Sequence, residues 1–390
     1  MKNFSIFNIP IIAQVILAML LGAVQGLFMP SWFIRIFVTF NDFFGQFISF
    51  LMPLIILAMV AGSIANSQQN AGKMLTVTIT LVVLSTFVSG LFSLGIGEWL
   101  LPFCVDTDNT ALFQPQISSE LTPYFSLQLP PPLDVMSALG LALMFGLGVR
   151  SVKANALKKG ISEMQALVML CIEKVLVPLL PLYIFGVYLK MSVTGGMLDL
   201  ITNFAWVLLL TLGVLIMWVM ILFFIASMVS KSNPFKMMWQ MVPAAIMAFA
   251  TSSSAATIPM TLKSTKDLVR NEDTVSFVIP LCANLHVPSV TMYFVMSALT
   301  VMMMVDRPIE MTLFIPYIQV LTFTCVAAPA IPGGVVAILP VLASILGFSQ
   351  EMQAVCLSLG ILLDAPLTAV NVVCDGAICV IVDKTVAKES

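Results

Sequence analysis

The sequence predicts an all-α polytopic membrane protein with eight transmembrane helices and two opposed re-entrant helical hairpins. Hydrophobic residues make up 60% of the 390 residues and charged residues only 9%, against about 25% charged in a typical soluble domain. Apolar stretches long enough to cross a hydrocarbon core of roughly 30 Å recur along the chain. Two further apolar segments are interrupted at their centres by residues that end helices. We treat the whole chain, 1–390, as one integral membrane unit.

The first transmembrane helix follows Lys2 without an A-x-A cleavage site, which favours a retained helix over a cleaved signal peptide. Several spans exceed the ~20 residues that a bilayer requires, so we expect them to tilt or to project from it. The eight spans are expected near residues 9–29, 33–65, 74–101, 133–149, 161–191, 198–230, 274–305 and 360–383.

The distribution of lysine and arginine predicts the orientation of these spans. Residues 102–130 contain three acidic residues and no lysine or arginine, whereas residues 150–159 contain four basic residues. Basic loops remain in the cytoplasm, and the resulting alternation places thirteen of the 17 basic residues on that side. We therefore expect cytoplasmic N- and C-termini and a location in a bacterial inner (plasma) membrane. The net charge of -2, with no basic run, argues against nucleic acid as a partner.

The apolar segment at 234–266 breaks this alternation, because basic residues flank it on both sides. Its centre, residues 250–259, reads ATSSSAATIP, a polar run closed by Pro259, and we expect this proline to interrupt the helix. Each arm of ~12 residues is about 18 Å long as a helix and cannot cross the membrane. We therefore expect a re-entrant hairpin, hairpin 1, whose tip lines a cavity or is buried in protein.

A second interrupted segment, hairpin 2, is expected at 310–350. Its centre, residues 327–334, reads AAPAIPGG, and two prolines with two glycines cannot continue a helix. Its flanks are mixed to acidic, which suits the outer side of the membrane. Two interrupted segments that enter from opposite sides indicate a secondary transporter with a binding site at the membrane midplane.

The last span carries four polar side chains at offsets of 4, 7 and 11 residues, which places them on one stripe of a helix. They are Asp364, Thr368, Asn371 and Asp375. A carboxylate within a bilayer is costly unless it faces a protein interior or an aqueous cavity, so the stripe is a candidate functional site. A polar face satisfied by neighbouring helices is the structural alternative.

Four features in this order resemble the dicarboxylate/amino acid:cation symporter family, which includes the glutamate transporters. They are a serine-rich hairpin that ends in T-I-P, a span with V-I-P-L-x-A, a Pro/Gly-rich hairpin, and a last helix with D-x-x-x-T-x-x-N-x-x-x-D. The resemblance implies a homotrimer with an elevator mechanism. In that arrangement residues 1–73 and 128–192 form a fixed scaffold, and residues 74–127 and 193–390 form the moving transport part.

The resemblance also implies roles for individual residues. Asp364 would bind the ammonium group of an amino acid, with Thr368 and Asn371 beside the substrate, and Asp375 would ligate sodium. The first hairpin would receive the substrate's α-carboxylate through Ser252, Ser253 and Ser254, helped by a half-helix N-terminus. The second hairpin would close over the substrate through Ala330, Ile331, Pro332 and Gly333.

Two departures from the family pattern change the expected substrate and ion. Leu367 stands where members with acidic substrates carry an arginine, so an acidic amino acid is disfavoured. The family's N-M-D-G-T motif is replaced by H-V-P-S-V at 286–290, which removes oxygen ligands that a hard cation needs. We expect His286, Asn371 and Asp375 to take part in ion coupling, with a proton in place of at least one sodium ion. A neutral, hydrogen-bonded structural histidine is the alternative, and a sodium site built mainly from backbone carbonyls remains open.

We therefore expect a symporter for a small neutral amino acid, in contact with membrane lipid, with no cofactor other than a possible sodium ion. A receptor or passive channel on the same scaffold is the alternative, because sodium ligands are missing. An intramembrane aspartyl protease is disfavoured, since Asp364 and Asp375 lie ~16 Å apart along one helix and cannot share a proton as a catalytic dyad does.

Overall fold

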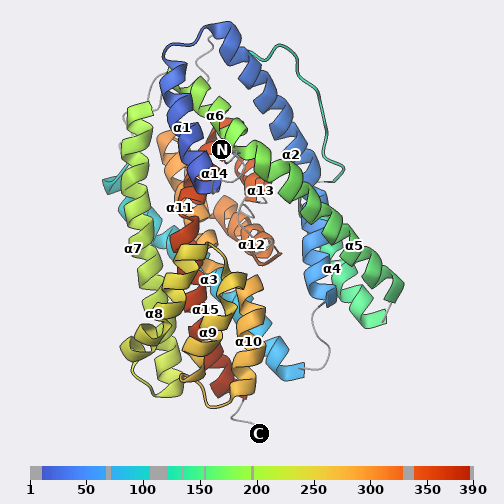
Figure 1. The fold of residues 1–390 in the computed structure, drawn as a ribbon, viewed down its shortest axis with the longest axis vertical. Coiled ribbons are helices and arrows are strands. Elements are labelled where there is room, and N and C mark those ends of the chain that lie inside the picture. Colours follow the sequence, from blue (N-terminus) through green and yellow to red (C-terminus); the bar gives the residue numbers. More distant parts are fainter. Residues whose placement is uncertain are drawn as a thin grey trace, which may run out of the picture.

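The computed structural model describes residues 11–66, 72–105, 121–133, 135–152, 155–194, 197–327 and 338–386. Over these residues the regular structure is entirely helical, as Figure 1 shows. Within them, six helices or helix pairs are long and apolar enough to cross a membrane. Two shorter apolar helices lie at 13–26 and 311–326. The protein is an integral membrane protein with several helical spans.

The N-terminal half contains a group of five helices, α1 (Ile11–Gly26), α2 (Ser31–Asn66), α4 (Val135–Val152), α5 (Asn155–Cys171) and α6 (Val177–Thr194). Helix α1 packs along α6, and α2 contacts α4, α5 and α6 (Figure 1). A π-helical turn at Ile172–Leu176 joins α5 to α6, so the helix expected at 161–191 starts earlier and has two parts.

Close packing of α1 on α6 requires a glycine. A Cβ at Gly22 would lie 2.6 Å from the backbone oxygen of Phe185, closer than real Cβ contacts allow. Small residues that let helix backbones approach are typical of helix contacts in membranes.

A second group surrounds the C-terminal helix. Helix α3 (Gly72–Leu100), which ends in a 3₁₀ turn at Leu101–Phe103, crosses α11 (Pro288–Met304) and α12 (Met311–Ala327). The last helix, α15 (Asp364–Val386), packs against α7 (Met197–Ser230) and α3. Residues from Leu367 to Asp383 are mostly buried, so α15 lies inside the bundle and not on its surface.

The segment expected as hairpin 1 consists of two contacting helices, α8 (Pro234–Thr251) and α9 (Ser254–Lys266). The chain reverses at Ser252, which adopts the left-handed conformation with φ 46°, and Ser253 then caps α9 by accepting a hydrogen bond from the Ala256 amide. The expected interruption at Pro259 is wrong. This proline lies in the middle of α9, which continues through it; the serines make the turn.

The span expected at 274–305 is two helices, α10 (Glu272–Leu285) and α11, separated at His286 and Val287. The break was not predicted. It has a simple cause, because Pro288 has no N–H to donate and is favoured only at the start of the following helix.

The chain after α12 continues with α13 (Leu339–Leu346) and α14 (Gln350–Leu362). The Pro/Gly-rich centre of hairpin 2 falls at 328–337, outside the described residues. The last helix was expected to run from Gly360, but α14 ends before Leu363 and α15 starts anew at Asp364. This boundary places Asp364 in the first helical turn, where the positive end of the helix dipole favours a carboxylate.

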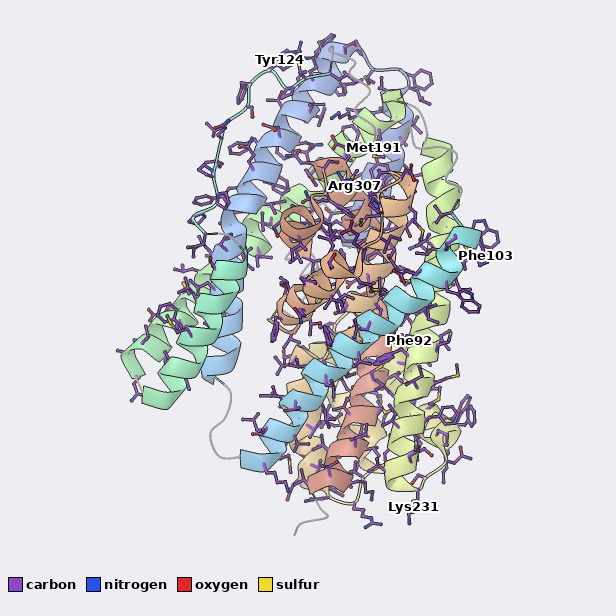
Figure 2. The ribbon with its side chains drawn as sticks, turned by 180° about the vertical axis from the view of Figure 1, so that it is seen from behind. Phe92, Phe103, Tyr124, Met191, Lys231 and Arg307 are labelled. Atoms are coloured by element: carbon purple, nitrogen blue, oxygen red, sulfur yellow. The ribbon has the colours of Figure 1, made fainter. Side chains whose placement is uncertain are left out.

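An extended segment, 121–129, lies along α2, and we call it the strap. Tyr124 is hydrogen-bonded through its amide to Thr39 Oγ1 at 2.9 Å, and the Arg35 guanidinium lies 4.1 Å from the centre of its ring. Figure 2 shows Tyr124 beside one end of α2, at the opposite end of the molecule from Lys231. The Leu129 amide also donates to Gln46, so the strap is held along about three turns of α2.

Candidate functional site

Helix α15 positions three of the four predicted polar residues inside the protein. The exposed fraction falls along the helix, from 8% at Thr368 to 3% at Asn371 and 1% at Asp375. Asp364 is half-buried at the start of the helix. Because buried polar groups are costly without partners, what faces each of these side chains decides what it can do.

Asp375 faces His286. The carboxylate Oδ1 lies 2.9 Å from the imidazole Nδ1, and both side chains are buried. The other ring nitrogen, Nε2, lies 3.0 Å from the hydroxyl of Ser85 on α3. Three helices, α3, α10 and α15, therefore meet at one imidazole whose two nitrogens both have partners.

The serine is suited to both protonation states of this imidazole. A hydroxyl can donate or accept a hydrogen bond, so Ser85 donates to Nε2 when the ring is neutral with its proton on Nδ1. When both nitrogens carry protons, the same hydroxyl accepts. The contact between Ser85 and His286 thus persists whether or not the pair holds an additional proton.

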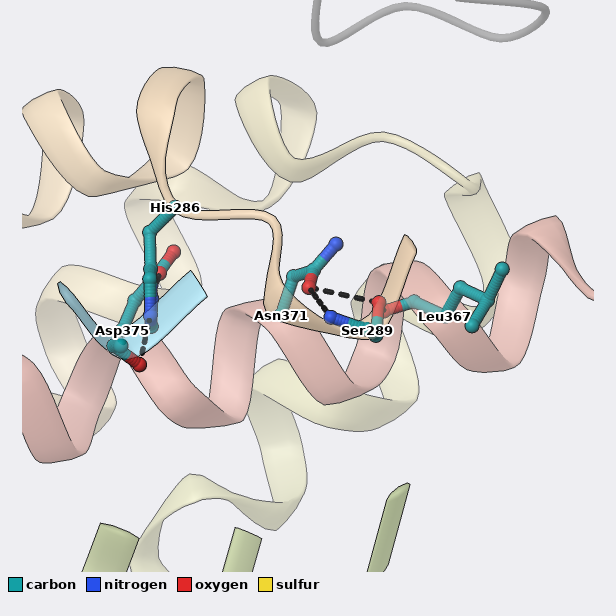
Figure 3. A network of polar contacts seen from close by, with 6 residues as sticks. His286, Ser289, Leu367, Asn371 and Asp375 are labelled. Carbon is teal, nitrogen blue, oxygen red and sulfur yellow. Dashed lines mark hydrogen bonds and ion pairs between the residues drawn. The ribbon is translucent and has the colours of Figure 1, made fainter. Parts of the chain in front are cut away.

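Ser289, at the start of α11, holds the next polar residue of α15. Its amide and hydroxyl both donate to Asn371 Oδ1, at 3.1 and 2.8 Å, as Figure 3 shows. Its hydroxyl also lies 2.8 Å from the backbone oxygen of Leu367. Because a backbone N–H can only donate, the Asn371 atom that it meets is the carbonyl oxygen. The amide nitrogen of Asn371 therefore points away from Ser289 (Figure 3) and presents two N–H donors.

The Asp364 side chain, unlike those of Asn371 and Asp375, has no hydrogen-bond partner among the described residues. Its carboxylate accepts no hydrogen bond and forms no ion pair with the residues that the structure describes, whereas its backbone oxygen accepts from Thr368 Oγ1 at 2.8 Å. The residues of the second hairpin that were expected to close over the substrate, Ala330 to Gly333, lie outside the described residues.

The tip of the first hairpin combines a cap with half-buried serines. Ser252 is half-buried in the turn after α8, Ser253 caps α9, and Ser254 is buried. The first amides of a helix and its dipole attract an anion. An anionic group of a ligand at this tip would meet serine hydroxyls as well as the first amides of α9.

The surroundings of Asp375 do not fit a sodium ion. A hard cation needs several oxygen ligands, but the described partner of the Asp375 Oδ1 atom is a nitrogen, the Nδ1 atom of His286, at 2.9 Å. Within the described part of the chain, no group of three or more His, Cys, Asp or Glu residues could hold a metal ion. The predicted sodium role of Asp375 therefore remains without support from the side chains around it.

Sequence reasoning did not find Ser85 or Ser289. Ser85 belongs to a row of buried hydroxyls on α3, together with Thr78, Ser89 and Ser93. Their spacing of seven and four residues puts them on one face of α3. This spacing is visible in the sequence and indicates a helix face that packs against polar groups.

Comparison with known proteins decides the class of this molecule. Residues 11–385 match the sequence profile of the sodium:dicarboxylate symporter family. The chain belongs to this family. The resemblance drawn from the hairpins and the last helix is confirmed, and the protein is a cation-coupled membrane symporter and not an enzyme. Membership implies the glutamate-transporter fold.

Curated members of the family match over nearly the whole chain. The serine/threonine transporter SstT of Lacticaseibacillus casei (strain BL23) is 23% identical over 386 residues, which cover 93% of this chain and 86% of that protein. The serine/threonine transporter SstT of Streptococcus thermophilus (strain CNRZ 1066) is 24% identical over 400 residues, with 97% of each chain covered.

Proposed function

We propose that the protein takes up a small neutral amino acid, such as serine or threonine, together with a proton. The single observation that carries the substrate part is the half-buried carboxylate of Asp364, which has no partner among the described residues. A buried carboxylate is costly without a cation, and the ammonium group of an amino acid supplies one. The matching relatives are named as serine/threonine transporters, which agrees with this class.

The neighbouring side chains support a neutral substrate. Leu367 is 1% exposed and offers no charge to a second carboxylate. The amide nitrogen of Asn371, which points away from Ser289 (Figure 3), and the hairpin tip at Ser252–Ser254 provide donors for one α-carboxylate. An additional side-chain carboxylate would be desolvated without a partner, at a cost of about 2–5 kcal/mol.

A proton on the His286–Asp375 pair takes the role of a bound cation in this proposal. Sodium with an ionised aspartate is electrically neutral, and so is the His286–Asp375 pair when it holds one additional proton. An anionic pair in an apolar interior is costly, and Ser85 can satisfy the ring in both states. The pair can thus accept and release one proton without losing its hydrogen bonds.

The larger movement follows from the family fold. We propose that α1, α2, α4, α5 and α6 form the scaffold of a homotrimer, and that α8, α9 and the helices around α15 move as an elevator. Eight spans with two re-entrant hairpins and cytoplasmic termini complete this arrangement. The proposal draws support from the basic flanks of the segment at 234–266, which place both ends of α8–α9 on one side.

The test of the proposed substrate is competition for uptake. Proteoliposomes with the purified protein are given radiolabelled L-serine and an excess of alanine, threonine, aspartate or glutamate. We expect the neutral amino acids to compete at least roughly thirtyfold better than the acidic ones, the factor that corresponds to ~2 kcal/mol. Stronger competition by aspartate contradicts the proposal. Serine binding without uptake under any gradient identifies a receptor instead.

A further inference from the structure

A cavity away from α15 contains an unexplained buried polar atom. The cavity has a volume of about 290 Å³ and lies between α2, α6, the start of α14 and the first residues of the strap. Its polar lining consists of Asn41, Asp42, Thr122, Lys190, Gln350 and Glu351. Small-molecule sites start at roughly 300 Å³, so the space suits a ligand no larger than a small amino acid.

Asn41 supplies the acceptor that lacks a partner. Its side chain is 6% exposed, and its Oδ1 accepts no hydrogen bond from the described residues. The amide packs against α6 at Gly186, where a Cβ would lie 2.7 Å from Asn41 Nδ2 and 2.8 Å from Asn41 Oδ1. Buried acceptors are nearly always satisfied, so an amide fixed in this way at a cavity wall calls for a donor from a ligand.

Asp42 adds a negative charge beside this acceptor. Both hydrogen bonds that its carboxylate accepts end at Oδ2, from Gln46 Nε2 at 2.9 Å and from Ser126 Oγ on the strap at 2.8 Å. These two bonds orient the carboxylate and leave Oδ1 for a further donor. Asn41 and Asp42 both line the cavity, and a charged acceptor in its wall fits an ammonium group.

Lys190 provides the opposite charge in the same cavity. Its Nζ lies 2.6 Å from Glu351 Oε1, and an ammonium group has three donors. The pair is neutral as a whole and retains donors on Lys190. The cavity therefore offers a partner for an anionic group at Lys190 and for a cationic group at Asp42. A zwitterion uses both partners, whereas a simple cation uses only one.

We propose that this cavity is a second amino-acid site, in which Asn41 and Asp42 bind the ammonium group and Lys190 binds the carboxylate of a small zwitterionic amino acid. The choice of an amino acid rests on the proposed function, whereas the site itself rests on the cavity. Its walls come both from α2 and α6 and from α14. A bound amino acid therefore connects the N-terminal helix group to the helix that precedes Asp364.

The test counts L-serine sites by equilibrium binding to the detergent-solubilised protein. We expect two sites per protomer in the parent and one in Asp364→Asn. We also expect one site in Asp42→Asn, and none in the double variant. Asp267→Asn is the matched control, because it neutralises an exposed carboxylate outside both sites, and it retains both sites. Asn41→Ala is a second variant at the cavity and should also lose one site.

Each outcome is decisive for one of the two proposals. If Asp364→Asn loses all serine binding, or if Asp42→Asn and Asn41→Ala both keep the parental number of sites, the second site does not exist. If Asp364→Asn keeps both sites, the proposed function fails and the cavity proposal is tested separately by Asp42→Asn. In the Asp364→Asn background, ethanolamine and lactate should each compete at least about tenfold more weakly than serine. Equal competition by ethanolamine shows a cation site and overturns the zwitterion proposal.

Discussion

The two carboxyl groups of α15 lie on the same helix but face opposite situations. Asp375 is buried and meets the imidazole of His286 at 2.9 Å, so its partner belongs to the chain itself. Asp364, eleven residues earlier, is half-buried and meets no partner among the described residues. A carboxylate with a built-in partner needs no ligand, whereas one without a partner needs a cation from outside.

We propose that substrate recognition and ion coupling are separated along α15, with recognition at Asp364 and coupling at Asp375. At the end near Asp364, the carboxylate has no partner among the described residues, and we propose that it binds the ammonium group of the substrate. At the end near Asp375, the carboxylate is already paired with His286, and we propose that this pair takes up a proton. Variants that change one end and spare the other can break or sharpen this comparison.

The largest effect is expected for Asp364→Asn. The change removes the charge that pairs with the substrate ammonium and keeps the size of the side chain, at a cost of about 2–5 kcal/mol in binding. Serine uptake into proteoliposomes should fall by roughly thirtyfold or more. Asp267→Asn, which neutralises an exposed carboxylate, should leave uptake unchanged. Normal uptake by Asp364→Asn would show that the substrate is not recognised through its amino group.

The next effect concerns His286→Gln. Glutamine can still form hydrogen bonds with Asp375 and Ser85 but does not take up a proton near neutral pH. We expect accumulation driven by a proton gradient to be lost, while serine binding at Asp364 changes little. Asn284→Ala, an exposed position two residues away, serves as the control. Unchanged proton-driven accumulation in His286→Gln would mean that the histidine is structural.

Ser85→Ala should have a smaller effect at the same end of α15. The variant removes the acceptor for the second ring proton, and an unsatisfied buried donor costs about 1–3 kcal/mol. Half-maximal uptake should then require a severalfold higher proton concentration. The matched control is Ser93→Ala on the same helix, because the Ser93 hydroxyl is buried and has no partner among the described residues. Identical proton dependence in both variants would remove Ser85 from the coupling site.

The smallest effect is expected at Glu351, a third carboxylate, which is partly exposed and paired with Lys190. Burial raises the pKa of Glu351, but the Lys190 ammonium, through its charge and hydrogen bond, more than offsets this and leaves the pKa below the ordinary value. A group with a lowered pKa stabilises the fold above its ordinary pKa, and this contribution disappears as the pH falls through the lowered value.

Glu351→Gln should therefore unfold at a lower temperature than the parent at pH 7, by the equivalent of about 1 kcal/mol for a pair that is about one-third exposed. The difference should shrink as the pH falls below ~4. Thermal unfolding in detergent at several pH values measures it. A difference that is independent of pH would show that packing, and not the ion pair, is responsible.

The sequence predicted most helices because apolar length and basic flanks act locally. It also found Asp364, Thr368, Asn371 and Asp375, since a polar stripe in an apolar helix is visible from spacing alone. It located His286 at a changed position but not the contact with Ser85, which lies 201 residues away in the chain. Such a contact depends on how α3 crosses α10, and no local pattern determines that crossing.

Two boundaries were also missed because the responsible residues act through the backbone. The first hairpin was expected to turn within 250–259, with the helix interrupted at Pro259, yet a left-handed serine, Ser252, makes the turn and α9 continues through the proline. The break before α11 comes from Pro288, which starts a helix more readily than it ends one.

The most direct test of the central claim is serine uptake with the two gradients separated. Proteoliposomes with an inward proton gradient are measured with sodium replaced by choline, and a second set is measured with a sodium gradient at equal pH on both sides. If His286 stands in place of a cation beside Asp375, the proton gradient alone drives accumulation and sodium adds little. Uptake that vanishes without sodium and ignores the proton gradient would contradict the account.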